Sequence, residues 1–98
     1  MQSISMQAFT EKVANENVSI LDVRGIEKYR AGHIPGAKRY IAGETQAKLS
    51  PEITYYIICQ VGVTSVRVTK ALEALGFDVI NVEGGMVQWQ GDLAVDES

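Results

Sequence analysis

Cysteine and histidine are nearly absent from the chain: its 98 residues include one of each, Cys59 and His33. One cysteine cannot form an internal disulfide, so a reducing, cytoplasmic compartment is expected. No Cys-x-x-Cys or His-x-x-x-His pair is present from which a structural zinc site could be built. The P-loop and the dinucleotide-binding glycine pattern are absent too, because Gly84-Gly85 is an isolated pair.

An excess of positive charge and a long apolar run are also missing. Nine basic and twelve acidic side chains give a net charge of −3, which argues against nucleic acid or an anionic membrane as a partner. The longest strongly apolar run, Tyr55–Cys59, is far too short to span a bilayer. The first residues do not combine a basic segment with an apolar stretch, so we expect no export signal.

The composition is that of one globular domain, with 46% hydrophobic and 21% charged residues. We expect residues 1–98 to form that domain, with a core over about residues 3–90. The segment 91–98 is an acidic, weakly apolar tail whose end is expected to fray.

Helix and strand patterns alternate along the first half of the chain. Ser5 is placed to cap a helix in which Met6, Phe9 and Val13 share one face. After it the pattern predicts a buried strand over Val18–Val23, a helix over Ile26–Ala31 that stops at Gly32, a turn at Ile34-Pro35-Gly36, a short strand over Lys38–Ile41 and a weak helix over Glu44–Leu49.

The second half predicts a strand, a helix and a strand within about thirty residues. The strands are Thr54–Cys59 and Val79–Val82. The helix runs over Ser65–Leu75, with an apolar stripe of Val68, Ala71, Leu72 and Leu75. Such a unit has parallel strands and a right-handed crossover. The expected fold class is therefore α/β, a small parallel sheet with helices on both faces.

Ligands of such sheets bind beyond the carboxyl ends of the strands. Three predicted strand ends bring chemistry to that edge: Asp22-Val23-Arg24, Cys59-Gln60-Val61-Gly62 and Glu83-Gly84-Gly85. A carboxylate, a guanidinium, a thiol and three glycines are thus expected to lie close together.

The loop after Cys59 can stabilise an anion through its backbone. The link Gln60–Thr64 is short enough to curl its N–H groups inward beside a helix start, which Thr64 or Ser65 can cap. Bringing a thiol from a pKa near 8.5 to about 6.5 takes roughly 2.7 kcal/mol. A helix end supplies about 0.3–1 kcal/mol, and up to about 2 in a partly buried setting. Loop amides must supply the rest, because Gln60–Ser65 contains no Lys, Arg or His. The same position also suits an inert, buried cysteine, and spacing alone leaves both interpretations open.

Several motifs together resemble the single-domain rhodaneses, which are sulfurtransferases. The motifs are Leu21-Asp22-Val23-Arg24, Tyr29 with Gly32-His33-Ile34-Pro35-Gly36-Ala37, Cys59-x-x-Gly62-Val63-Thr64-Ser65, Glu83-Gly84-Gly85 and Trp89. They follow the order of the family, and the resemblance spans about Ser3 to Trp89.

The resemblance implies a persulfide cycle at Cys59. Its thiolate would take a sulfane sulfur from thiosulfate or a low-molecular-weight persulfide and pass it to cyanide or a thiol. The backbone N–H groups of the loop would hold the substrate, and the loop residues are Gln60, Val61, Gly62, Val63, Thr64 and Ser65. This chemistry needs no metal and no bound cofactor. The implied partners are a small sulfur donor, a thiol acceptor and, in addition, a protein sulfur acceptor.

Other polar residues have structural interpretations beside the functional ones. Asp22 and Arg24 either support the Cys59 loop or meet an anionic substrate, and a structural ion pair is the favoured interpretation. His33 is expected to be a hydrogen-bonded turn residue rather than a base. Arg67 is the nearest basic residue in sequence to the loop, but its helical position faces outward.

The loop departs from many rhodanese loops because it carries no basic residue. This makes thiosulfate a doubtful donor and affects persulfide transfer less. A phosphatase with a related cysteine loop would need an arginine where Ser65 stands. A non-enzymatic module of the same fold, for binding, sensing or carrying sulfur, remains the second hypothesis.

Overall fold

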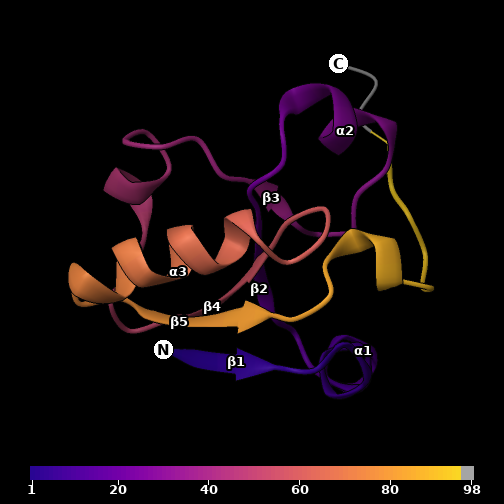
Figure 1. Cartoon of the computed structure of the whole chain (residues 1–98), viewed down its shortest axis with the longest axis horizontal. Helices are drawn as coiled ribbons and strands as arrows, with labels where there is room; N and C mark the ends of the chain where they lie inside the picture. The colour runs from indigo at the N-terminus through magenta and orange to yellow at the C-terminus, as the bar shows by residue number, and fades with distance from the viewer. Residues whose placement is uncertain (96–98) are drawn as a thin grey trace.

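Five parallel strands form one sheet, in the spatial order β1-β5-β4-β2-β3 (Figure 1). The computed structural model describes residues 1–95. The strands are β1 (Gln2–Ile4), β2 (Ser19–Asp22), β3 (Lys38–Arg39), β4 (Thr54–Ile58) and β5 (Asp78–Val82). The helices are α1 (Met6–Asn15), α2 (Ile26–Ala31) and α3 (Thr64–Ala74), with two 3₁₀ turns, η1 (Gln46–Lys48) and η2 (Met86–Gln88).

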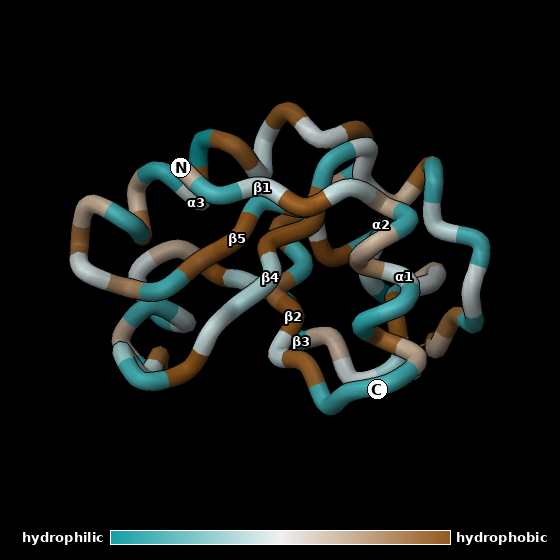
Figure 2. The backbone as a smooth tube through the Cα atoms, turned by 90° about the horizontal axis from the view of Figure 1, so that it is seen from below, coloured by the Kyte–Doolittle hydropathy of each residue, from teal (hydrophilic) through white to brown (hydrophobic). Residues whose placement is uncertain are grey.

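The middle strand, β4, divides the core into two layers because its side chains alternate between the two faces of the sheet. Tyr56 and Ile58 pack with Phe9 of α1 on one face. Tyr55 and Ile57 pack with Leu72 of α3 on the other, and α3 lies across β4 and β5 in Figure 1. Figure 2 shows the apolar stretches of these strands running through the interior of the molecule. The predicted fold class, a parallel sheet with helices on both faces, is confirmed.

The first half of the chain follows the predicted order of elements. The Ser5 hydroxyl accepts the Ala8 N–H at 3.1 Å and caps α1. The helix α2 has the predicted bounds and ends at Gly32. The strand expected over Lys38–Ile41 is shorter, and the helix expected over Glu44–Leu49 is a single 3₁₀ turn.

The sequence pattern did not predict the edge strand β1. The face of α3 that it predicted to be buried also differs from the face that packs on the sheet. Gln2, Ser3 and Ile4 pair in parallel register with β5. On α3 the fully buried side chains are Ser65, Thr69 and Leu72, whereas Leu75 is 57% exposed. Thr69 can be buried at little cost because its hydroxyl donates to the Ser65 carbonyl at 2.6 Å, so the helix itself satisfies the polar group.

The chain beyond η2 returns to the body of the domain. Trp89 Nε1–H donates to the Asp92 carbonyl at 2.9 Å, and Ala94 forms an antiparallel bridge with His33. The expected fraying of the tail concerns residues 96–98, which lie outside the described residues. Within residues 1–95 no helix has the length and apolar character needed to cross a membrane.

Candidate active site

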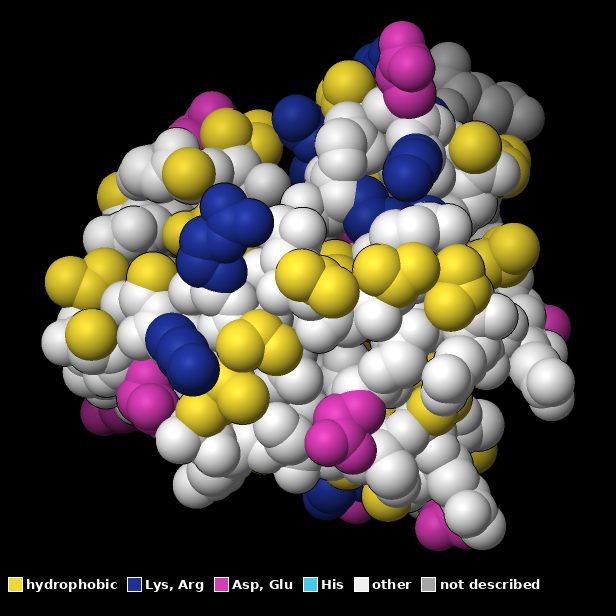
Figure 3. Space-filling view, viewed as in Figure 1, with side chains coloured by type: hydrophobic (Ala, Val, Ile, Leu, Met, Phe, Trp, Pro, Cys, Tyr) yellow, Lys and Arg dark blue, Asp and Glu magenta, His cyan; other side chains and the backbone are white. Residues whose placement is uncertain are grey.

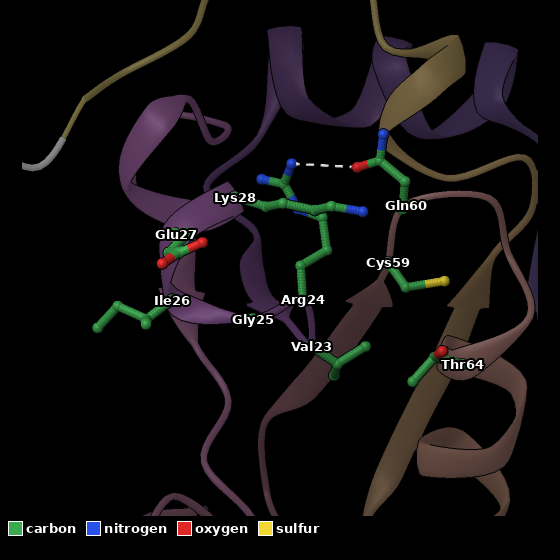
Figure 4. Close-up of a pocket in the computed structure, with 9 residues that line it drawn as sticks. All are labelled: Val23, Arg24, Gly25, Ile26, Glu27, Lys28, Cys59, Gln60 and Thr64. Carbon is green, nitrogen blue, oxygen red and sulfur yellow. Dashed lines mark hydrogen bonds between the residues drawn. The ribbon is translucent and has the colours of Figure 1, made fainter.

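The carboxyl ends of β2 and β4 border one cavity of about 520 Å³, drawn in Figure 4. Cys59 follows β4 directly, and Asp22, the last residue of β2, pairs in register with Ile58. The cavity is lined by Val23, Arg24, Gly25, Ile26, Glu27, Lys28, Cys59, Gln60 and Thr64. The strand order therefore brings the thiol and the guanidinium to the same edge of the sheet.

The sulfur of Cys59 is surrounded by hydrogen-bond donors from its own loop. Sγ accepts the Gly62 N–H at 3.1 Å. Ser65 Oγ lies 3.3 Å from Sγ, where it can accept the proton of a thiol or donate its own to a thiolate. Although Cys59 is only 3% exposed, it borders the cavity, so its sulfur is not sealed into hydrocarbon.

These contacts favour the anionic form of the sulfur. Burial raises the pKa of the Cys59 thiol, but hydrogen bonds from the Ser65 hydroxyl and from the amides of Ser65, Gly62 and Val61 outweigh it, so the pKa lies below its ordinary value. The start of α3 adds the partial positive charge of its free N–H groups. A lowered pKa increases the thiolate fraction at neutral pH, and the thiolate is the nucleophilic form of cysteine.

The turn η2 fixes the backbone of this loop through two hydrogen bonds. The Met86 N–H donates to the Cys59 carbonyl at 2.7 Å, and the Val87 N–H donates to the Gln60 carbonyl at 3.1 Å. Gly85 makes this approach possible, because a Cβ there would lie 2.6 Å from the Cys59 carbonyl oxygen. Its φ of +68° also belongs to the region that glycine enters without strain.

Asp22 and Arg24 form a buried ion pair beside the loop. Arg24 Nη2 lies 2.8 Å from Asp22 Oδ2, and the Arg24 side chain and carboxylate are 8% and 0% exposed. The same guanidinium donates to the Gly32 carbonyl at 2.7 Å and to Gln60 Oε1 at 3.4 Å (Figure 4). The pair thus connects the end of β2 to Gly32 at the end of α2 and to Gln60 of the Cys59 loop.

The other predicted loop residues contribute in different ways. Val61 and Val63 turn their side chains outward, at 57% and 67% exposure. Thr64 borders the cavity as the first residue of α3. The expectation that Thr64 or Ser65 caps this helix is wrong: Val63 occupies the cap position without a side-chain hydrogen bond. Ser65 is fully buried, and its hydroxyl is turned to the sulfur instead.

His33 has the structural environment that the sequence predicted. Its Nδ1 donates to the Tyr29 carbonyl at 2.8 Å, and its ring stacks on the Tyr29 ring with centroids 3.9 Å apart. In the described part of the chain, no group of three His, Cys, Asp or Glu side chains is arranged to hold a metal ion.

Three residues of α2 line the cavity, although the sequence pattern did not predict them as site residues. Ile26, Glu27 and Lys28 line it opposite Cys59. The only available signal was that α2 starts two residues after Arg24, close to the same strand end. Which of its side chains face the cavity depends on how the helix packs, and the sequence pattern does not carry that information.

Comparison with known proteins gives a consistent result. The family model described as "Rhodanese-like domain" matches residues 5–92. The chain is 38% identical over 96 residues to "Putative sulfurtransferase YtwF" of Bacillus subtilis (strain 168), covering 94% of this chain and 93% of the relative. It is 41% identical over 93 residues to "Putative sulfur carrier protein YrkF" of the same organism, covering 90% of this chain and 50% of that protein.

A solved structure extends the agreement to the whole fold. The rhodanese-like domain protein of Staphylococcus aureus superposes with a TM-score of 0.90 at 37% identity, covering 99% of this chain and all of the other. The predicted resemblance is thereby confirmed: this chain belongs to the rhodanese-like domain family.

Proposed function

We propose that the chain is a sulfurtransferase in which Cys59 carries a sulfane sulfur between a donor and an acceptor. The observation that carries this proposal is the environment of Sγ, which has the Gly62 amide at 3.1 Å and the Ser65 hydroxyl at 3.3 Å. Family membership supports it, because the two Bacillus relatives are named for sulfur transfer and sulfur carriage.

The first step loads the cysteine. The Cys59 thiolate attacks the outer sulfur of thiosulfate, and a new S–S bond forms to Sγ. The bond between that outer sulfur and the sulfonate sulfur breaks, and sulfite leaves with the electron pair. With a low-molecular-weight persulfide as donor, the thiolate of the small molecule is the leaving group. Cys59 then bears a terminal, negatively charged sulfur.

The second step unloads it. Cyanide or a thiolate attacks the terminal sulfur, and Sγ departs as the thiolate it was at the start. Fixed N–H donors stabilise the negative charge without having to reorganise during the reaction. The proposed acceptors include a protein thiol, because Cys59 borders an open cavity.

A second candidate is a module that carries or senses sulfur without turning it over. The relative named a sulfur carrier and the absence of Lys and Arg from Gln60–Ser65 favour it. Multiple turnovers with any donor and acceptor would distinguish the enzyme from this module, which would load once and stop.

Intact-mass spectrometry tests the shared first step. The protein is incubated with thiosulfate and, separately, with glutathione persulfide, and a gain of one sulfur atom is expected. The Cys59→Ser variant should keep its fold and show no gain. Absence of the sulfur adduct with both donors, or an equal adduct in Cys59→Ser, would contradict the proposal.

A further inference from the structure

We infer that Lys28 of α2 is the residue that selects negatively charged sulfur donors for Cys59, in place of the basic residues that the loop lacks. This inference rests on the proposed function for its substrate class. It concerns one residue of the cavity and makes a claim about charge that can be tested without sulfur transfer.

Lys28 is in position to act on a ligand at Cys59. It lines the same cavity as Cys59 and Gln60. Figure 4 shows its side chain extending from α2 toward the side of the cavity where these two residues lie. On the face seen in Figure 3, Lys and Arg side chains lie next to hydrophobic ones over α2 and the loop after β4.

The other charged side chains that line the cavity are either paired or directed away from Cys59. Arg24 is paired with the buried carboxylate of Asp22, so the two charges largely cancel. Glu27 borders the cavity too, but its carboxylate lies on the side away from Cys59 in Figure 4. The ion pairs found within residues 1–95 do not include Lys28. Its ammonium group is therefore available to an anionic ligand.

The charge of the whole chain gives a cation near Cys59 a defined role. With a net charge of −3, the protein as a whole repels anions such as thiosulfate. Arg67 is exposed on α3 and is not among the residues that line the cavity. Lys28 thus offers the positive charge, while Ile26 and Val23 of the same cavity offer apolar contact to the organic part of a larger donor.

The test compares how Cys59 reacts with an anionic and a neutral alkylating reagent. Iodoacetate and iodoacetamide both require the thiolate, so any change in its pKa cancels in the ratio of their rate constants. We expect Lys28→Gln to lower the iodoacetate-to-iodoacetamide ratio roughly three- to tenfold. Lys28→Arg should keep the ratio, and high salt should lower the wild-type ratio toward that of Lys28→Gln.

Lys70→Gln is the matched control. Lys70 is an exposed lysine of α3 that does not line the cavity, so the substitution changes the net charge equally. A ratio that stays unchanged in Lys28→Gln, or that falls equally in Lys70→Gln, would overturn the inference.

Thiosulfate kinetics link the result to sulfur transfer. Lys28→Gln should raise the KM for thiosulfate severalfold and leave kcat nearly unchanged. If the alkylation ratio falls but no variant transfers sulfur, the proposed function fails and the charge selectivity stands. If transfer proceeds with unchanged KM and an unchanged ratio, the proposed function stands and the role of Lys28 fails.

Discussion

At the scale of single residues, the sulfur of Cys59 depends on Ser65 more than on any other side chain. The Ser65 hydroxyl is the foremost of the groups that lower the pKa of the Cys59 thiol against the effect of burial. A hydroxyl can act on both forms of the sulfur, because it accepts from a thiol and donates to a thiolate. The Ser65 hydroxyl therefore has a hydrogen bond to offer to the thiol as well as to the thiolate.

Ser65→Ala removes this donor and should raise the pKa of Cys59. A hydrogen bond to a charged group contributes about 1.5–3 kcal/mol, so the expected rise is about one to two pKa units. The pH dependence of iodoacetamide alkylation measures it. Thr69→Val is the control, because it also removes a buried hydroxyl from α3, but one that bonds the Ser65 carbonyl. Equal pKa values in the wild type and Ser65→Ala would contradict the role given to the hydroxyl.

The sequence could place Cys59 and its loop but could not identify every contact around the sulfur. A cysteine that ends an apolar strand lies at the edge of the sheet where ligands bind, whatever the details of the fold. The direction of the Ser65 hydroxyl depends on how the first turn of α3 meets the loop. The exposure of Lys28 to the cavity likewise depends on the packing of α2, and neither is encoded in residue spacing.

At the scale of elements, buried strands were easier to predict from the sequence than elements at the edge or surface of the fold. The apolar runs Val18–Val23 and Thr54–Cys59 are long enough to identify β2 and β4, which each end one residue earlier than predicted. The strand β1 has only three residues, and its pairing with β5 decides its conformation. On α3 an apolar-only stripe misses Thr69, because a hydroxyl satisfied within its own helix can be buried like a methyl group.

Leu72 of α3 and Leu75, which follows the last residue of the helix, test which face of α3 is buried. Leu72 is fully buried against the sheet, whereas Leu75 is 57% exposed, although both belong to the predicted apolar stripe. Leu72→Ala should lower the free energy of unfolding by about 2–5 kcal/mol. Leu75→Ala should change it by less than about 1 kcal/mol. Urea denaturation of both variants measures the two values, and similar losses would show that the helix faces the sheet as the sequence pattern predicted.

At the scale of the whole molecule, the topology of the parallel sheet brings the residues of the site together. Because all the strands run in the same direction, the carboxyl ends of β2 and β4 reach the same edge and bring the ion pair of Asp22 and Arg24 beside Cys59. The loop backbone is held from the other side by η2, whose approach requires glycine at position 85. Only the folded chain can therefore surround the sulfur with donors, and ionisation of the thiol becomes linked to folding.

This linkage predicts how stability depends on pH. The pKa of Cys59 is lowered in the folded protein, while the unfolded chain has the ordinary value near 8.5. Between the two values the folded state is ionised and the unfolded state still holds the proton, so raising the pH favours folding. The stabilisation is complete above the unfolded pKa and is lost as the pH falls through the folded pKa.

The measurement is the difference in unfolding free energy between the wild type and Cys59→Ser, taken from urea denaturation across this range. Subtraction removes the titration of the other groups, because Cys59→Ser lacks only the thiol. The difference should rise with pH by about 1.4 kcal/mol for each pKa unit between the folded and unfolded values and be level on either side. A difference that is flat throughout, or that falls as the pH rises, would mean that the folded loop does not favour the thiolate, and the proposed sulfur transfer would lose its physical basis.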